Sequence, residues 1–262
     1  MHKIGCDLPI EICAGWINHI NAMNAMAGYP HVSKYTEILL IRVMRGDLAA
    51  DDAVEKVLSF HAVTRRDETE QVLRQEGNPA DSGRGITVSR LCGGDPVLKQ
   101  AEADLFAVRS VEASLFHYNH INFDFLGRLH HCLFQDMYFS AGILRGDICH
   151  KDADFVLPAD LPEALKAWCD KLARTEFCED IFGKQLAEVW AGFDRIHPFC
   201  EGNSRMACVL LDQIIHLYGY CLEMPCYGQN AGAELRLARR LALSGDIELL
   251  RFKIEHGLKM VE

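Results

Sequence analysis

The sequence predicts a mainly α-helical protein. Three observations support this fold class: apolar residues recur at helical spacings of three and four, long alternating stretches typical of strands are absent, and glycines follow several periodic stretches as helix stops. The chain has 262 residues, of which 49% are apolar. A chain of this size can bury one sizeable core and a smaller appendage.

The N-terminal residues 1–64 are expected to form a small helical segment. One helix should end before Gly28, a second should run over 33–45 and stop at Gly46, and a third should run from Asp51 to Phe60. Glycine readily adopts the left-handed conformation that ends a helix, so both glycines suit these positions. We therefore predict three short helices in this segment.

Residues 65–95 are predicted to be a linker, because they are polar and rich in turn-forming residues. The two stretches that carry this signal are Asp67-Glu68-Thr69-Glu70 and Gly77-Asn78-Pro79-Ala80-Asp81-Ser82-Gly83-Arg84-Gly85. The linker separates the N-terminal segment from a larger unit over 96–262.

Two amphipathic helices are predicted around residue 200. The first has its apolar face at Leu186, Val189, Trp190, Phe193 and Ile196. The second has apolar or buried-face positions at Met206, Val209, Leu210, Gln213, Ile214 and Leu217, and stops at Gly219. A proline at 198 ends or follows the first helix, so the residues between the two helices form a loop.

This loop begins with a candidate general base and a candidate metal ligand. Histidine titrates near neutral pH, so His197 can accept a proton from a hydroxyl group. Glu201 supplies a carboxylate that suits a hard cation such as Mg²⁺. The histidines at 130, 131 and 150 have no partner at the spacing of a metal site, and we interpret them as structural or solvated.

The end of the loop has the residues of an anion site. Gly202 lets the backbone approach an anion closely, and Asn203 adds an amide at the expected start of the second helix. Ser204 follows, and Arg205 offers a fork of donors that matches phosphate oxygens. We therefore predict that positions 202–205 bind phosphate.

Composition excludes several classes of function. The net charge of −10 argues against nucleic-acid binding, which uses basic patches. No apolar run is long enough to span a membrane, and the first residues lack the apolar core of a signal peptide. The 11 cysteines are scattered and form no Cys-x-x-Cys pair, which indicates free thiols and a cytoplasmic location.

The stretch His197-Pro198-Phe199-Cys200-Glu201-Gly202-Asn203-Ser204-Arg205 resembles the signature of the Fic (Fic/Doc) family. A second stretch, Leu129 to Tyr138 followed by Ala141-Gly142-Ile143-Leu144-Arg145, is similar to another segment of that family. The resemblance implies a Fic-type helical bundle with a short β-hairpin flap, which would fall on 149–157. It implies a protein adenylyltransferase, which transfers AMP from ATP to a Ser, Thr or Tyr hydroxyl of a target protein.

The resemblance also assigns roles to the loop residues. His197 would be the general base, Glu201 would hold Mg²⁺, and Asn203 with the backbone after Gly202 would steady the phosphate oxygens. Arg205 would bind the leaving phosphates. Target protein, ATP and Mg²⁺ are therefore the expected partners and cofactor.

The N-terminal segment resembles the small helical antitoxins that restrain some bacterial Fic toxins. In those proteins a helix places a glutamate against the second arginine of the Fic motif. Here the glutamate position falls on Ala27, the preceding hydroxyl position on Met23, and the second arginine position on Cys208. Self-inhibition by this segment, if it operates, must therefore differ from that pattern. Two outcomes follow: an unrestrained enzyme, or one with slow transfer because a cation is missing.

The alternative from another functional class is a catalytically weak or inactive Fic-fold protein that binds or regulates a partner. Ser204 and Cys208 depart from the family pattern and favour this alternative. Retention of His197, Glu201 and Asn203 favours an enzyme.

Overall fold

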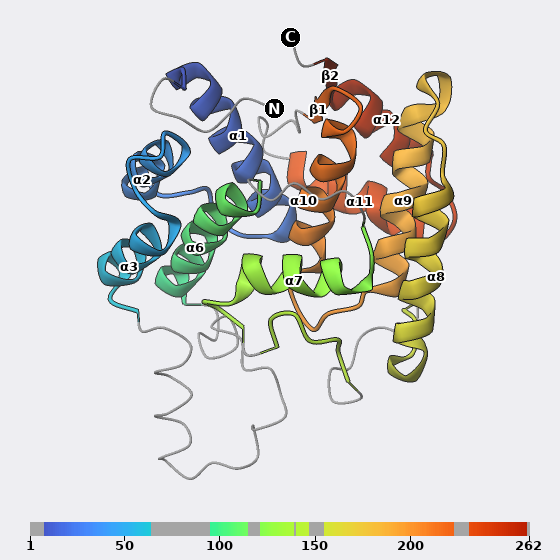
Figure 1. The fold of residues 1–262 in the computed structure, drawn as a ribbon, viewed down its shortest axis with the longest axis horizontal. Coiled ribbons are helices and arrows are strands. Elements are labelled where there is room, and N and C mark those ends of the chain that lie inside the picture. The colour runs from blue at the N-terminus through green and yellow to red at the C-terminus, as the bar shows by residue number, and fades with distance from the viewer. Residues whose placement is uncertain are drawn as a thin grey trace.

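The computed structural model describes residues 8–63, 95–114, 121–138, 140–146, 155–222 and 231–260. These residues form a mainly helical fold, which confirms the predicted fold class (Figure 1). In chain order the elements are α1 (Ile10–Ala27), α2 (Lys34–Met44), α3 (Ala50–His61), α6 (Pro96–Ser114), α7 (Phe123–Phe134), the 3₁₀ turn η2 (Pro158–Asp160), α8 (Leu161–Arg174), the 3₁₀ turn η3 (Glu179–Ile181), α9 (Phe182–Ile196), α10 (Asn203–His216), β1 (Tyr220–Leu222), α11 (Ala231–Leu243), α12 (Glu248–Gly257) and β2 (Leu258–Met260).

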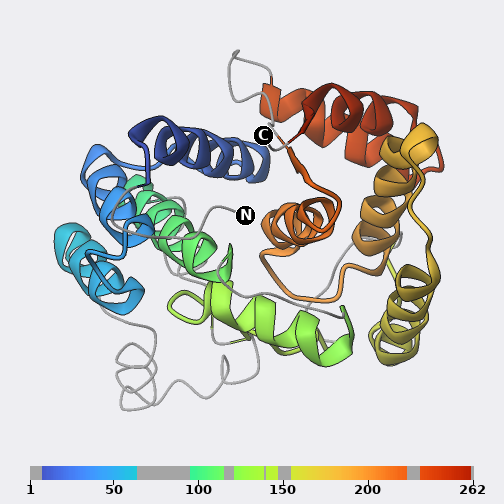
Figure 2. The ribbon, with the colours of Figure 1, turned by 45° about the horizontal axis from the view of Figure 1, so that its top comes forward.

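Helix α10 lies in the middle of the molecule, with α1, α6, α7 and α9 packed against it (Figure 2). Its side chains from Arg205 to Asp212 are all buried. A helix that is buried on every side is held by tertiary packing rather than by its own propensity. The loop that precedes α10 is therefore attached to a helix in the core of the fold.

The three predicted N-terminal helices are confirmed. Gly28 ends α1 with φ of 84°, and the side chain of Ser33 caps α2 by accepting a hydrogen bond from the Thr36 N–H. Gly46, with φ of 77°, lies in the turn between α2 and α3. Local signals of this kind depend only on neighbouring residues, which is why the sequence predicts them well.

Asp104 on α6 joins the N-terminal helices to the rest of the protein. Its buried carboxylate accepts hydrogen bonds from the backbone N–H (2.8 Å) and the hydroxyl (2.6 Å) of Ser33, and it lies 2.8 Å from Nε2 of His61. Apolar residues of α1, α2 and α3 belong to the same hydrophobic core as those of the later helices. The predicted linker at 65–95 lies, apart from residue 95, outside the described residues, so the proposed division of the chain stays a prediction.

Two short strands form an antiparallel pair near the C-terminus. Tyr220 pairs with Met260, and Leu222 pairs with Leu258. This sheet was not predicted from the sequence. The flap expected over 149–157 lies mostly outside the described residues, and its last three residues form no strand. No helix in the described part of the chain is both long and apolar enough to cross a membrane.

Candidate functional site

His197 has an unusual backbone conformation. It directly follows α9 and adopts the left-handed region, with φ of 48° and ψ of 60°, and its N–H donates to the Phe193 carbonyl. A residue with a Cβ atom pays roughly 1–2 kcal/mol for this conformation, and such strain is concentrated at functional sites. The imidazole ring stacks on Phe155, with ring centroids 4.1 Å apart. The candidate base is therefore held in one orientation by its backbone and by a ring.

Asn203 closes the loop by hydrogen bonding to Phe199. The Phe199 N–H donates to Oδ1 of Asn203 (3.0 Å), and Nδ2 of Asn203 donates to the Phe199 carbonyl (2.7 Å). Both residues are buried, and the Phe199 ring stacks on His130 with centroids 3.8 Å apart. In this conformation the Asn203 amide braces the loop, so any contact with a phosphate group would have to share an amide that is already engaged.

Gly202 brings the backbone to the start of α10. Its φ is 77°, and a Cβ atom added here would lie 2.5 Å from Cε2 of Phe134. As the N-cap residue of α10, Gly202 has no side chain that could cap the helix. The first N–H groups of a helix have no partner within the helix, and the helix dipole adds partial positive charge there. This end of α10 is therefore suited to bind an anion, as the sequence predicts.

Glu201 lies in the same loop and is positioned by His130. Its main-chain carbonyl accepts a hydrogen bond from Nε2 of His130 (3.0 Å), while Nδ1 of His130 accepts one from the Gly142 N–H (2.9 Å). One ring nitrogen donates and the other accepts, which requires the neutral imidazole. His130 is thus a structural residue beneath the loop, as the sequence indicates, and His150 lies outside the described residues.

His130 should make the protein sensitive to acid. Burial lowers the pKa of His130 to about 3. Below about pH 6.5 this histidine is protonated in the unfolded chain but stays neutral in the folded protein. The free energy of unfolding therefore falls by about 1.4 kcal/mol for each pH unit between about pH 6.5 and about pH 3. We expect the variant His130→Gln, which keeps a donor and an acceptor, to lose this part of the slope. Urea unfolding at a series of pH values measures it, and equal slopes in both proteins would refute the assignment.

The Arg205 guanidinium points into the protein interior. Its side chain is about 2% exposed, and one nitrogen donates to Oε1 of Glu102 and to the hydroxyl of Tyr138, both at 2.6 Å. Tyr138 also donates to Glu102. The Tyr29 ring lies against the guanidinium, 4.2 Å from its central carbon. We call these four residues, Arg205, Glu102, Tyr138 and Tyr29, the Arg205 cluster.

The Arg205 cluster is electrostatically matched. Burial by itself would lower the pKa of Arg205, but the nearby Tyr138 and Glu102 outweigh it and raise the pKa above its usual value. For Tyr29, burial raises the pKa to about 12, so this hydroxyl stays protonated. Nη1 of Arg205 is buried without a hydrogen-bond partner among the described residues. Arg205 is therefore charged and largely engaged by protein groups before any phosphate arrives.

Cys208 contacts α1 rather than open space. It is buried, and its sulfur lies 3.9 Å from the sulfur of Met26. Met26 precedes Ala27, the position at which the antitoxin pattern has its glutamate. Arg239 of α11 lies 3.6 Å from the same Met26 sulfur and forms an ion pair with Asp194. An arginine at position 208 would bring a second buried cation close to Arg239. A neutral cysteine at position 208 avoids this repulsion between two cations.

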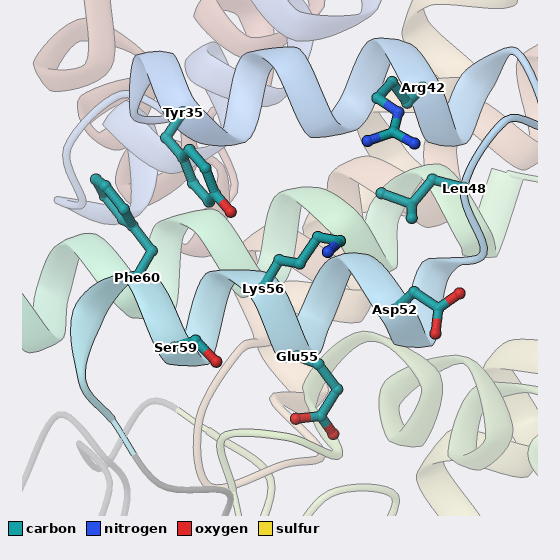
Figure 3. Close-up of a pocket in the computed structure, with 8 residues that line it drawn as sticks. All are labelled: Tyr35, Arg42, Leu48, Asp52, Glu55, Lys56, Ser59 and Phe60. Atoms are coloured by element: carbon teal, nitrogen blue, oxygen red, sulfur yellow. The ribbon is translucent and has the colours of Figure 1, made fainter.

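An open groove elsewhere on the protein is separate from this loop. It lies between α2 and α3, with a volume of about 850 Å³ (Figure 3). Its lining carries both charge signs and consists of Tyr35, Arg42, Leu48, Asp52, Glu55, Lys56, Ser59 and Phe60. None of these residues belongs to the loop or to α10, so the groove is not the candidate nucleotide site.

Sequence reasoning identified the loop but missed most of the Arg205 cluster. Glu102 was not singled out, although it is an acid in a stretch of small and apolar residues, Ala101 to Val108, in which only Asp104 is also charged. A charged residue within a buried face usually has a charged partner. A charged residue in an apolar stretch therefore indicates a buried ion pair, but it does not identify the arginine that is the partner.

The fold and the loop together define a class: a helical protein in which a histidine with a left-handed backbone conformation begins the loop that leads into a buried helix. Residues 120–215 match the family described as Fic/DOC, which confirms the resemblance found in the sequence. No curated protein matches the whole sequence significantly.

Solved structures of Fic proteins share the fold. BepC from Bartonella tribocorum with bound AMPPNP is 14% identical, with a TM-score of 0.53, and the match covers 67% of this chain and 88% of that one. A Bep effector Fic domain from Bartonella quintana with bound ADP gives 18% identity and a TM-score of 0.51 over 62% and 84% of the two chains. A Fic-1 fragment from C. elegans gives 17% identity and 0.51 over 94% and 81%. At these identities the likeness concerns the fold.

Proposed function

We propose that this protein is a protein adenylyltransferase that transfers AMP from ATP to a Ser, Thr or Tyr hydroxyl of a target protein. The observation that carries the proposal is the arrangement of one loop. A histidine held in a left-handed backbone conformation precedes a carboxylate, a close-approach glycine and the uncapped N-terminus of α10. These groups are what phosphoryl chemistry needs, namely a base, an anion site and a cation ligand.

His197 would act as the general base. A neutral imidazole can accept a proton at physiological pH, and stacking on Phe155 would keep the ring in the orientation required for that transfer. The hydroxyl oxygen of the target then forms a bond to the α-phosphorus of ATP. The bond from that phosphorus to the bridging oxygen breaks, and pyrophosphate leaves.

The anion site would hold the phosphates during this step. The backbone N–H groups that follow Gly202, together with Ser204, would face the α- and β-phosphate oxygens. Pre-placed donors of this kind stabilise the charge that develops as the bonds change. Asn203 would contribute by holding the loop in shape, because its amide is bound to Phe199.

Glu201 would bind Mg²⁺ together with the phosphates. Mg²⁺ is commonly held by one or two carboxylates and by substrate phosphate oxygens, so a single carboxylate in this loop fits that ion. When bound, it would neutralise phosphate charge. Within the described residues there is no cluster of three or more His, Cys, Asp or Glu side chains suited to a metal, which is consistent with a site that the nucleotide completes.

We further propose that the Arg205 cluster restrains this activity. Glu102 occupies the guanidinium that would otherwise bind the leaving phosphates, and Tyr29, just beyond α1, lies over it. This arrangement would give the N-terminal segment a route to self-inhibition without the glutamate that is absent at Ala27. Transfer should therefore be slow until Arg205 exchanges Glu102 for phosphate. Cys13, Cys132, Cys169, Cys178 and Cys208 are free thiols, which suits the cytoplasm.

A labelling experiment tests the proposal. The protein is incubated with Mg²⁺ and ATP labelled at the α-phosphorus, alone and in a cell lysate, beside His197→Ala. We expect protein-bound label in the wild type and its loss in His197→Ala, because the base is removed. Binding of ATP should persist in this variant, since the anion site is unchanged, and calorimetry checks this.

A second candidate function is a Fic-fold protein that binds or regulates a partner without catalysis. The observation that favours it is that neither arginine position of the motif offers a free cation: Arg205 is buried with Glu102, and position 208 is a buried cysteine. ATP binding with no label in any variant would support this candidate.

A further inference from the structure

Arg145 lies directly beneath the candidate base. Its side chain is buried, and Nε donates to the His197 carbonyl at 2.7 Å. Nη2 of the same guanidinium lies 3.4 Å from the Ile196 carbonyl and also donates to the Val156 carbonyl. One planar group therefore binds the last residue of α9, the histidine that follows it, and the chain next to Phe155.

The backbone around Arg145 follows the same loop. The Arg145 N–H donates to the Pro198 carbonyl at 2.9 Å, and Leu144 forms an antiparallel bridge with Phe199. The Val156 N–H donates to the Arg195 carbonyl at 3.2 Å. Hydrogen bonds thus join the end of α9 and the loop after it to two segments that are distant in sequence, one at Leu144–Arg145 and one at Val156.

These hydrogen bonds stabilise the unfavourable backbone conformation of His197. The left-handed conformation of His197 is unfavourable for a residue with a Cβ atom, and the surrounding contacts must maintain it. The orientation of the His197 carbonyl depends on its ψ angle, so a hydrogen bond from Arg145 to that oxygen fixes ψ. Stacking on Phe155 restricts the ring. Because Val156 is bound to the same guanidinium, the position of Phe155 depends on Arg145 as well.

We propose that Arg145 is a positioning residue for His197, which it holds directly through the His197 carbonyl and indirectly through the placement of Phe155. This role rests on the proposed function only in its kinetic consequence. An ammonium group cannot form the planar fork that spans three carbonyl oxygens. Arg145→Lys keeps the charge but should release His197, and Phe155→Leu should release the ring alone.

The test combines a spectroscopic and a kinetic measurement on the full chain. The imidazole signals of His197, assigned by their loss in His197→Ala, are followed by NMR in the wild type, Arg145→Lys and Phe155→Leu. The matched control is Arg195→Lys. The Arg195 side chain also donates to a carbonyl oxygen, that of Leu243 at 3.0 Å, but it is exposed and this bond does not involve the His197 loop. The transfer of α-labelled ATP is then measured as kcat and KM in each protein.

We expect the His197 signals to shift or broaden in Arg145→Lys and Phe155→Leu and to stay unchanged in Arg195→Lys. In Arg145→Lys kcat should fall about 100-fold, with KM for ATP unchanged, since displacement of a catalytic group by about 1 Å has that effect. Unaltered His197 signals in Arg145→Lys would overturn the proposal. Because the NMR readout needs no turnover, absence of transfer in the wild type would refute the proposed function while the signals still decide the role of Arg145. If Arg145→Lys does not fold, Arg145→Gln, which keeps one amide donor but not the fork, provides the same decision.

Discussion

Replacing Glu102 by Gln is expected to lower the free energy of unfolding by about 3–5 kcal/mol, because it leaves the buried charge of Arg205 without its anionic partner. Arg205 and Glu102 are both almost completely buried, and Oε1 of Glu102 accepts from Arg205 and from Tyr138. Gln has nearly the same shape, so the change removes charge rather than packing. Equilibrium unfolding in urea measures the effect.

The matched comparison is Arg205→Met, alone and combined with Glu102→Gln. Each single change leaves one member of the pair without its partner, whereas the double variant removes both charges. The double variant leaves no buried charge without its partner, so it should be more stable than the sum of the single effects predicts. Additive effects would show that the two side chains do not act as a pair.

Gly202→Ala should reduce transfer by about 100- to 1,000-fold, the range seen when donors to a developing oxyanion are lost. The added Cβ atom would lie 2.5 Å from the Phe134 ring. That ring cannot move aside easily, because it is completely buried against the rings of Phe106, His130 and Tyr138. The loop must move instead, which displaces the N–H groups at the start of α10. Transfer assays and ATP-binding measurements check this result.

Gly46→Ala is the control for backbone strain. Gly46 also has φ of 77°, but a Cβ atom added there would contact nothing within 4 Å. In both variants the positive φ, which alanine disfavours, should lower the free energy of unfolding by about 1 kcal/mol. Only Gly202→Ala should lose transfer. Equal activity in the two variants would mean that the loop after Glu201 does not hold the phosphates.

The helices and the loop could be predicted from the sequence because their signals are local. The apolar periodicity that ends at Ile196, and the glycine at 219, gave the helices on either side of the loop. Gly28, Ser33 and Gly46 gave the ends of the N-terminal helices. The motif from His197 to Arg205 likewise occupies one short stretch, so its residues lie together in any fold.

Features that depend on distant residues could not be predicted. Position 205 is the third residue of α10, and the sequence does not determine whether the guanidinium faces the loop or the interior. The answer depends on Glu102, which lies 103 positions away in the chain. The pairing of Tyr220 with Met260 is similarly distant, and each strand has only three residues. Such short strands carry too few residues for a periodic pattern.

The central claim, that the loop from His197 to Arg205 transfers a nucleotide, is tested most directly by supplying ATP labelled at either the α- or the γ-phosphorus in parallel reactions with Mg²⁺. The wild type should attach label from the α-position and none from the γ-position, because pyrophosphate leaves with the γ-phosphorus, and His197→Ala should attach neither. Label from the γ-position alone, or label from the α-position that persists in His197→Ala, would contradict the account.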